Sequence, residues 1–162
     1  MNIQNIPEEW FKEAERVAQG ELCTRAKCGA VLVSAEGEII GEGYNAPPKD
    51  DLANAKCDEQ FDRTKKPKYD LTCCMHAEWR AMQGALRVYP SKVVGSALYY
   101  VRLGDDGKLR PSGDPFCTEC SRFALDLSIA TFGLWHKDGI VLYDTKDYND
   151  RSYAYHKNET AR

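Results

Sequence analysis

Three segments of the chain carry hydrophobic side chains at helical spacing. The first covers residues 7–19, with Pro7 near its start and Gly20 after its end, as is typical of helix boundaries. Residues 76–87 and 117–127 show the same periodicity, so the pattern predicts three helices. The apolar positions of the first helix are Trp10, Phe11, Ala14, Val17 and Ala18.

The second predicted helix has a narrow apolar face. Ala77, Ala81 and Ala85 share this face, and the larger Met82 and Leu86 lie beside it. Small side chains allow a helix to sit close to a sheet, so we expect the backbone of this helix to approach a strand.

Five shorter runs are rich in β-branched and aromatic residues, which favour strands. The first two runs are joined by a short turn and predict a hairpin. Only residues 136–138 separate the last two. A parallel pair would need a crossover of about a dozen residues or more, so the final two strands must form an antiparallel hairpin. The five runs are residues 28–33, 38–43, 96–101, 130–135 and 139–143.

The order of these elements predicts an α/β fold. A helix, a hairpin, a helix, a strand, a helix and a final hairpin fit a three-layer α/β/α sandwich with a mixed five-stranded sheet. We expect a single domain over residues 1–162, with a core of about 7–145, because 162 residues can bury a core of their own. The polar C-terminal tail, residues 144–162, is expected to form a short helix or a subunit contact.

Two polar segments interrupt this order. Residues 46–72 are long for a loop in a compact domain, and such loops are usually functional or mobile. They contain a basic run that is either a solvated loop or a contact for a phosphate. Residues 104–113 predict either a small hairpin at the rim of a pocket or a neutral surface loop. The basic run consists of Arg63, Lys65, Lys66 and Lys68.

Composition and charge exclude several classes of protein. A formal net charge of −3 at pH 7 argues against a general binder of polyanions. The sequence shows no apolar run of membrane-helix length and no signal-peptide pattern in residues 1–20, so we expect a cytoplasmic protein. Seven cysteines, an odd number, fit reduced thiols and metal binding better than a disulfide framework.

Two short segments hold residues with metal chemistry. His76 and Glu78 stand at the start of the second predicted helix, and Cys117 and Cys120 at the start of the third, where thiolates are stabilised. A catalytic zinc site uses three nitrogen or sulfur ligands and leaves one position for water. The spacing predicts one catalytic Zn²⁺ ion held by His76, Cys117 and Cys120, with Glu78 as the free carboxylate beside the water. The alternative is that both thiols are buried as small hydrophobic groups and that His76 caps a helix.

This combination of His-x-Glu with Pro-x-Cys-x-x-Cys resembles the signature of zinc-dependent nucleobase deaminases. Over about residues 7–145 the order of elements resembles the cytidine and deoxycytidylate deaminase superfamily. Two positions depart from the family pattern. Phe116 stands between Pro115 and Cys117, where proline usually precedes cysteine directly, and Arg80 stands where asparagine is common.

The resemblance implies a zinc-dependent hydrolase that deaminates cytosine in a nucleotide or a nucleoside. Glu78 would take a proton from the metal-bound water, pass it to the ring nitrogen and then protonate the leaving amine. The family binds the base carbonyl with the backbone at Ala77. It contacts the sugar with the asparagine of the Gly-Tyr-Asn segment, here Asn45. From the residues alone, Asn45 could equally be a turn residue that bonds its own backbone.

The small residues Gly29 and Ala30 leave room beside the first strand. They indicate either a flat pocket wall for a planar base or tight packing within the sheet.

The expected substrate is a small molecule, and the resemblance divides between two branches. The segment up to Asn45 resembles deoxycytidylate deaminases, which favours dCMP or CMP. The antiparallel final hairpin resembles the free-nucleoside branch, which favours cytidine or deoxycytidine. A homo-oligomer is usual in the family and is expected here, whereas a membrane partner is not.

Three alternatives remain open at this point. A deaminase of another aminated heterocycle would use the same chemistry. A deaminase of a base in RNA or DNA would need a basic or aromatic track for the strand, and only the run at residues 63–68 hints at one, so no nucleic-acid partner is expected. A non-catalytic, zinc-stabilised binding module would close its site with a fourth ligand, which Cys73 or Cys74 could supply.

The surplus cysteines allow a further hypothesis. Some relatives carry a second, structural zinc near the long loop, and Cys57 with Cys73 or Cys74 could begin such a site. The competing interpretation is that these thiols are simply buried.

Overall fold

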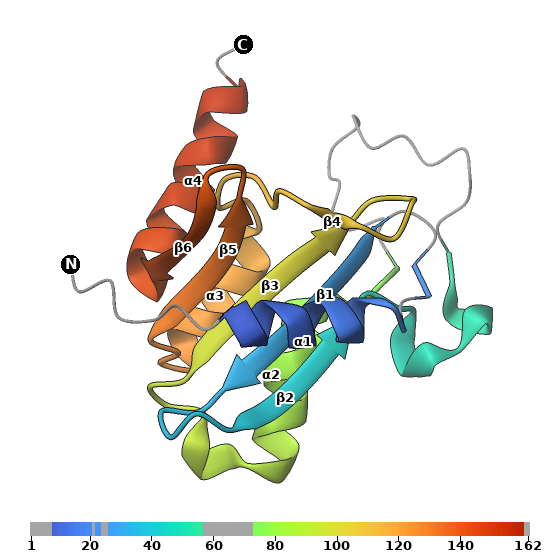
Figure 1. The fold of residues 1–162 in the computed structure, drawn as a ribbon, viewed down its shortest axis with the longest axis horizontal. Coiled ribbons are helices and arrows are strands. Elements are labelled where there is room, and N and C mark those ends of the chain that lie inside the picture. Colours follow the sequence, from blue (N-terminus) through green and yellow to red (C-terminus); the bar gives the residue numbers. More distant parts are fainter. Residues whose placement is uncertain (1–7, 21, 24–25, 57–72, 161–162) are drawn as a thin grey trace.

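A mixed β-sheet forms the centre of the molecule (Figure 1). The computed structural model describes residues 8–20, 22–23, 26–56 and 73–160. Within them the strand order is β2-β1-β3-β5-β6, and a short β4 pairs with β3. Only β3 and β5 run parallel to each other, and every other pair is antiparallel. The strands are β1 Lys27–Val33, β2 Ile39–Tyr44, β3 Ala97–Leu103, β4 Leu109–Arg110, β5 Thr131–His136 and β6 Gly139–Asp144.

Helices cover both faces of this sheet. Helix α1 (Glu8–Ala18) lies on one face, and α2 (Ala77–Val88) and α3 (Thr118–Asp126) lie on the other (Figure 1). Helix α4 (Thr145–Thr160) follows β6 and packs beside α3. The predicted α/β/α layers, the mixed sheet and the antiparallel final hairpin are therefore confirmed.

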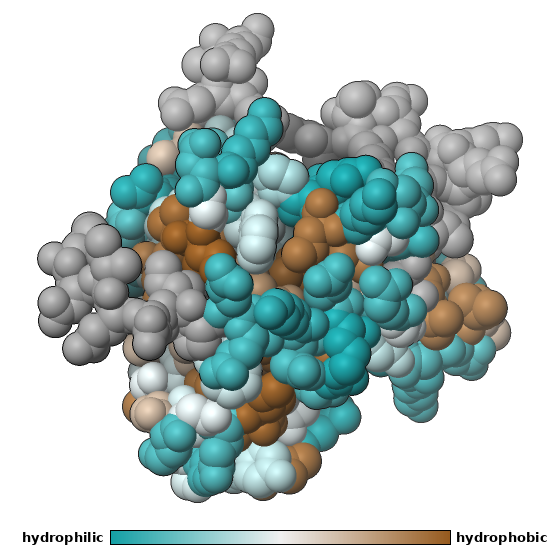
Figure 2. All heavy atoms as spheres, viewed as in Figure 1, coloured by the Kyte–Doolittle hydropathy of each residue, from teal (hydrophilic) through white to brown (hydrophobic). Residues whose placement is uncertain are grey.

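Successive residues of the strands point to opposite faces of the sheet, and each face carries its own hydrophobic cluster. Phe11 and Val17 of α1 pack with Val31 of β1 and Tyr99 of β3. The opposite cluster joins the alanine face of α2 to the even-numbered positions of β1, β3 and β5. Figure 2 shows a hydrophilic surface over the outer side of α1, with a hydrophobic patch beside it over the β5–β6 end of the sheet. The outward side of α1 thus follows the polar positions of its sequence.

The alanine face of α2 brings its backbone into direct contact with β2. A Cβ atom added at Gly41 would lie 2.1 Å from the carbonyl oxygen of Ala81, and one added at Gly43 would lie 2.1 Å from that of Ala77. Side-chain atoms cannot occupy either position, so the two glycines are required there. The close approach expected from the alanines is present, and it fixes where α2 begins relative to the end of β2.

Two segments differ in detail from the five-stranded prediction. Residues 104–113 form the hairpin that adds β4 as a sixth strand, closed by a bond from the Gly104 N–H to the Lys108 carbonyl (2.8 Å). The polar tail forms a helix of 16 residues. Its sequence lacks strong helical periodicity, and exposed ion pairs one turn apart, such as Lys146 with Asp150 (2.7 Å), support it instead.

The long polar segment begins with two short 3-10 turns, Pro48–Asp50 and Leu52–Asn54. The basic run at residues 63–68 lies outside the described residues. None of the described helices has both the length and the apolar character needed to cross a membrane.

Two glycine substitutions test the contact between α2 and β2. Gly43→Ala should lower the free energy of unfolding by about 1–3 kcal/mol, because the new methyl group must displace the Ala77 backbone. Gly84→Ala is the matched control, since Gly84 lies within α2 and a Cβ there meets nothing within 4 Å. It should raise stability by about 1 kcal/mol through helix propensity. Urea denaturation measures both values, and equal changes in the two variants would contradict this packing.

Candidate metal centre and active site

His76 is held at the start of α2 by the segment that follows β2. It is the residue immediately before the first helical turn. Met75 pairs with Ala46 through two backbone bonds, Met75 N–H to Ala46 O at 2.8 Å and Ala46 N–H to Met75 O at 3.4 Å. The Ala77 N–H donates to the side-chain oxygen of Asn45 at 2.8 Å. The backbone on both sides of His76 is therefore tied to the end of β2.

Cys117 and Cys120 lie in the first turn of α3. Cys117 caps this helix, and its Sγ accepts a bond from the Cys120 N–H at 3.4 Å. Cys120 is fully buried and Cys117 is nearly so. The cap places both sulfur atoms on the same side of the helix start.

The three predicted ligands meet in space. His76 Nδ1 lies 3.2 Å from Cys120 Sγ and 3.4 Å from Cys117 Sγ, and the two sulfur atoms are 3.1 Å apart. One nitrogen and two sulfur donors this close together match the ligand set that zinc prefers. These residues therefore fit a zinc ion, and within the described part of the chain they form the one cluster of at least three such donors.

The local charges couple metal binding to the release of protons. The Cys120 thiol and the His76 ring lower the pKa of Cys117 to about 4, against the effect of burial. Burial lowers the pKa of His76, but its contact with Cys117 and the charge of Glu78 raise it to about 9. Cys117 is thus a thiolate at neutral pH, the form that binds metal, whereas burial raises the pKa of Cys120 well above its ordinary value. Metal binding must therefore displace a proton from His76 and a proton from Cys120.

Glu78 is a buried carboxyl group in the first turn of α2. It is 6% exposed, and burial raises its pKa to about 7, although the charge of His76 opposes this. A carboxyl group with a pKa near neutral pH can both accept and donate a proton. Its place two residues after a metal ligand suits the predicted role in proton transfer.

Neutral polar groups surround Glu78, and the sequence interpretation missed them. The Tyr100 hydroxyl donates to Cys28 Sγ at 3.0 Å, and burial raises the pKa of Cys28 to about 12. Tyr148 of α4 is also buried and within electrostatic reach of Glu78. The alternation of β1 and β3 could have placed Cys28 and Tyr100 on this face. Nothing in the polar tail pointed to Tyr148.

The predicted substrate residues lie around the start of α2. Asn45 and Ala77 are linked by the hydrogen bond described above, so the Ala77 N–H expected for a base carbonyl is engaged by Asn45 in this structure. Ala30 is fully buried in β1, in the cluster that contains Ala77. The substrate roles of these three residues stay predictions.

Arg80, the first departure from the family pattern, anchors the segment after β2. Its guanidinium pairs with Asp50 at 2.7 Å and lies 4.7 Å from the centre of the Tyr44 ring. The Tyr44 hydroxyl donates to the same Asp50 carboxylate at 3.1 Å. Arg80 therefore joins α2 to the turn at Pro48–Asp50, next to Asn45.

The surplus cysteines near His76 do not join the cluster of donors. The sulfur atoms of Cys73 and Cys74 are 4.0 Å apart. Burial raises the pKa of Cys74, and a hydrogen bond to Cys23 raises it further. Neither belongs to the group formed by the three predicted ligands, so the fourth ligand required by a closed structural site is not supplied by them. Cys57 lies outside the described residues, and the second zinc site stays a prediction.

Comparisons with known proteins show that other proteins share this fold. Among solved structures, the dCMP deaminase from the cyanophage S-TIM5 in complex with dCMP and dUMP superposes with a TM-score of 0.56 at 24% sequence identity, over 82% of this chain and 81% of that chain. The cytidine deaminase from Burkholderia pseudomallei superposes with a TM-score of 0.59 at 17% identity, over 88% and 94%. A search of curated proteins gave no match.

A protein-family model, described as the cytidine and deoxycytidylate deaminase zinc-binding region, matches residues 4–134. This range contains all three metal-binding residues and Glu78. Because the match spans most of the 162 residues, the chain belongs to the cytidine and deoxycytidylate deaminase family.

Proposed function

We propose that this protein catalyses the zinc-dependent hydrolytic deamination of cytosine in a small nucleoside or nucleoside monophosphate. The products would be the corresponding uracil compound and ammonia. The observation that carries the proposal is the buried Glu78 carboxyl group, which has a pKa of about 7 and stands two residues from a metal-binding histidine. A purely structural zinc site has no use for a buried carboxyl group that is not a ligand.

The side chains of the site would have two roles in this reaction, which are to transfer protons and to balance the charge of the metal ion. When bound, zinc lowers the pKa of a coordinated water toward 7 and so supplies a hydroxide at neutral pH. Glu78 would accept a proton from the attacking water and donate it to the ring nitrogen of cytosine, while the water oxygen bonds to the carbon that carries the amine. Glu78 would then move the remaining proton of the added hydroxyl group to the amine, so that the carbon–nitrogen bond breaks and ammonia leaves. The thiolates of Cys117 and Cys120 offset the charge of the cation.

Substrate binding would use the groups at the junction of β2 and α2. The Ala77 N–H is the expected donor to the base carbonyl, and the Asn45 amide nitrogen is a donor for a sugar hydroxyl. The Ala77 N–H already donates to Asn45 Oδ1, so a base carbonyl would have to share this hydrogen or replace that bond. Ala30 would supply a flat wall for the base.

The relatives support a cytosine compound as the substrate class. One structural neighbour is a dCMP deaminase in complex with dCMP and dUMP, and another is a cytidine deaminase. The antiparallel β5–β6 hairpin favours a nucleoside, as the sequence resemblance suggested, whereas the segment ending at Asn45 favours a nucleotide. The expected homo-oligomer and cytoplasmic location stay predictions.

A substrate panel tests the proposal. Ammonia release by zinc-loaded protein should be measured with cytosine, cytidine, deoxycytidine, CMP, dCMP and a single-stranded oligonucleotide. Turnover of dCMP and CMP alone would assign a nucleotide substrate, and turnover of the nucleosides alone would assign a nucleoside. Absence of turnover on all of these compounds, with zinc bound, would reject the proposal, and turnover of the oligonucleotide alone would replace it with editing of a strand.

Glu78→Gln should abolish most turnover and leave the metal in place. The amide keeps the size of the side chain but cannot shuttle the proton, so we expect a loss of about 10²–10⁴-fold in kcat. Zinc content, measured by elemental analysis, should equal that of the wild type. Wild-type turnover in this variant would show that the carboxyl group has no catalytic role.

A pair of cysteine variants tests the metal site. Cys120→Ser should reduce zinc content and turnover together, because a hydroxyl group is a poor replacement for a thiolate ligand. Cys28→Ser is the matched control: Cys28 is also buried but accepts a hydrogen bond from Tyr100, which serine can accept as well. The control should retain one zinc per chain. Equal zinc content in both variants would contradict the assigned ligands.

A further inference from the structure

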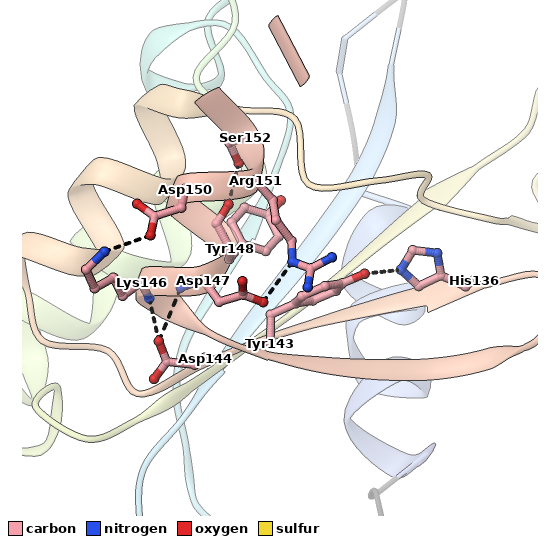
Figure 3. Close-up of polar contacts among 9 residues, drawn as sticks. All are labelled: His136, Tyr143, Asp144, Lys146, Asp147, Tyr148, Asp150, Arg151 and Ser152. Atoms are coloured by element: carbon pink, nitrogen blue, oxygen red, sulfur yellow. Dashed lines mark hydrogen bonds and ion pairs between the residues drawn. The ribbon is translucent and has the colours of Figure 1, made fainter. Parts of the chain in front are cut away.

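One face of the polar helix α4 is turned toward the two cysteine ligands. The residues of this face recur at helical spacing, so they form a single stripe. The exposed ion pairs of α4, Lys146 with Asp150 and Asp147 with Arg151, lie elsewhere on the helix (Figure 3). The stripe consists of Tyr148, Asn149, Ser152, Tyr155 and His156.

The first residue of the stripe holds the start of α4 against the core. Tyr148 is 3% exposed and stacks on Phe132 of β5, with ring centres 3.9 Å apart and planes 15° apart. The ring of Tyr143 of β6 packs edge-on against Tyr148. The Tyr143 hydroxyl is also hydrogen-bonded to His136 Nε2 (2.9 Å). These two contacts join the start of α4 to the β5–β6 hairpin (Figure 3). This packing fixes the start of α4 against β5 and β6.

Asn149 contacts the residue that follows the second cysteine ligand. The Ser121 hydroxyl donates to Asn149 Oδ1 at 2.8 Å, and Ser121 is fully buried directly after Cys120. The backbone of Ser121 in turn donates to the carbonyl of Cys117 at 3.0 Å. A displacement of Asn149 would therefore be transmitted to both ligands.

His156 contacts the residue that precedes the first cysteine ligand. Its Nε2–H donates to the carbonyl oxygen of Phe116 at 2.9 Å. The Phe116 ring packs edge-on against Tyr155, with centres 5.2 Å apart, and lies 4.8 Å from the His156 ring. Phe116 is the residue that separates Pro115 from Cys117, so the departure from the family pattern is the part of the loop that α4 holds.

Tyr148 precedes Asn149 at the buried end of the stripe. Burial raises its pKa, as do the charges of Glu78, Cys120 and Cys117, while the backbone amide of Phe116 lowers it.

We propose that α4 is a clamp that positions the Cys117–Cys120 turn for metal binding, with Asn149 and His156 as the positioning residues at its two ends. The clamp acts on the metal centre that the proposed function uses, and it rests on that function only for its consequence in turnover. Groups that orient metal ligands from behind commonly contribute 10- to 100-fold to metal affinity, so the effect should be measurable.

Zinc affinity of α4 variants tests the clamp directly. Asn149→Ala and His156→Ala should each weaken zinc binding by about 10-fold in competition with a chromophoric chelator. Asp150→Ala and Tyr153→Ala are the controls, because both residues are exposed on the same helix and Asp150 pairs with Lys146. Their zinc affinity should equal that of the wild type. Wild-type affinity in both clamp variants would overturn the proposal.

Conservative variants separate positioning from a general loss of stability. Asn149→Asp keeps an oxygen that accepts from Ser121, and His156→Gln keeps a donor for the Phe116 carbonyl, so both should recover most of the affinity. The absorption bands of bound Co²⁺ should shift in the alanine variants and return in the conservative ones. Equal losses in the alanine and conservative variants would also overturn the proposal. None of these readouts needs a substrate, so they hold whether or not cytosine compounds are turned over.

Discussion

The close approach of α2 to β2 is the constraint on which the site depends. Two glycines in β2 remove the side chains that would otherwise hold the helix away, and the alanine face of α2 fills the contact with backbone and methyl groups. The start of α2 is thereby fixed against the end of β2, where Asn45 meets Ala77 and Arg80 meets Asp50. This junction fixes the positions of His76 and Glu78. Helix α3 then supplies the two sulfur atoms that complete the site.

Electrostatics at the centre follows from burial as much as from charge. Cys117 and His76 stabilise each other's charged forms. Glu78 is almost completely buried, and this burial raises its pKa to about 7. The adjacent Cys28 and Tyr100 stay neutral because burial disfavours their anions. Glu78 can therefore exchange protons near neutral pH beside two groups, Cys28 and Tyr100, that keep theirs.

Local sequence patterns predicted most of the fold and the metal ligands. The helices at Ala77–Val88 and Thr118–Asp126 have clear periodicity, and each ligand lies at or near a helix start, so spacing alone placed His76, Cys117 and Cys120. The features that were missed depend on contacts between segments distant in sequence. The bond between Asn45 and Ala77 arises from the docking of α2, and the contacts of Phe116 arise from a helix whose composition resembles a polar tail.

If α4 strengthens metal binding, then metal binding must also stabilise α4. Coupling between two binding events is reciprocal, so any affinity that α4 lends to the metal is returned to α4 when the metal binds. A tenfold coupling corresponds to about 1.4 kcal/mol. Helix α4 is mostly polar, and apart from Tyr148 the burial of its side chains adds little to its stability. A coupling free energy of this size would therefore determine how often the last turns of α4 unfold. Amide hydrogen exchange in α4 would then report the occupancy of the metal centre from the end of the chain.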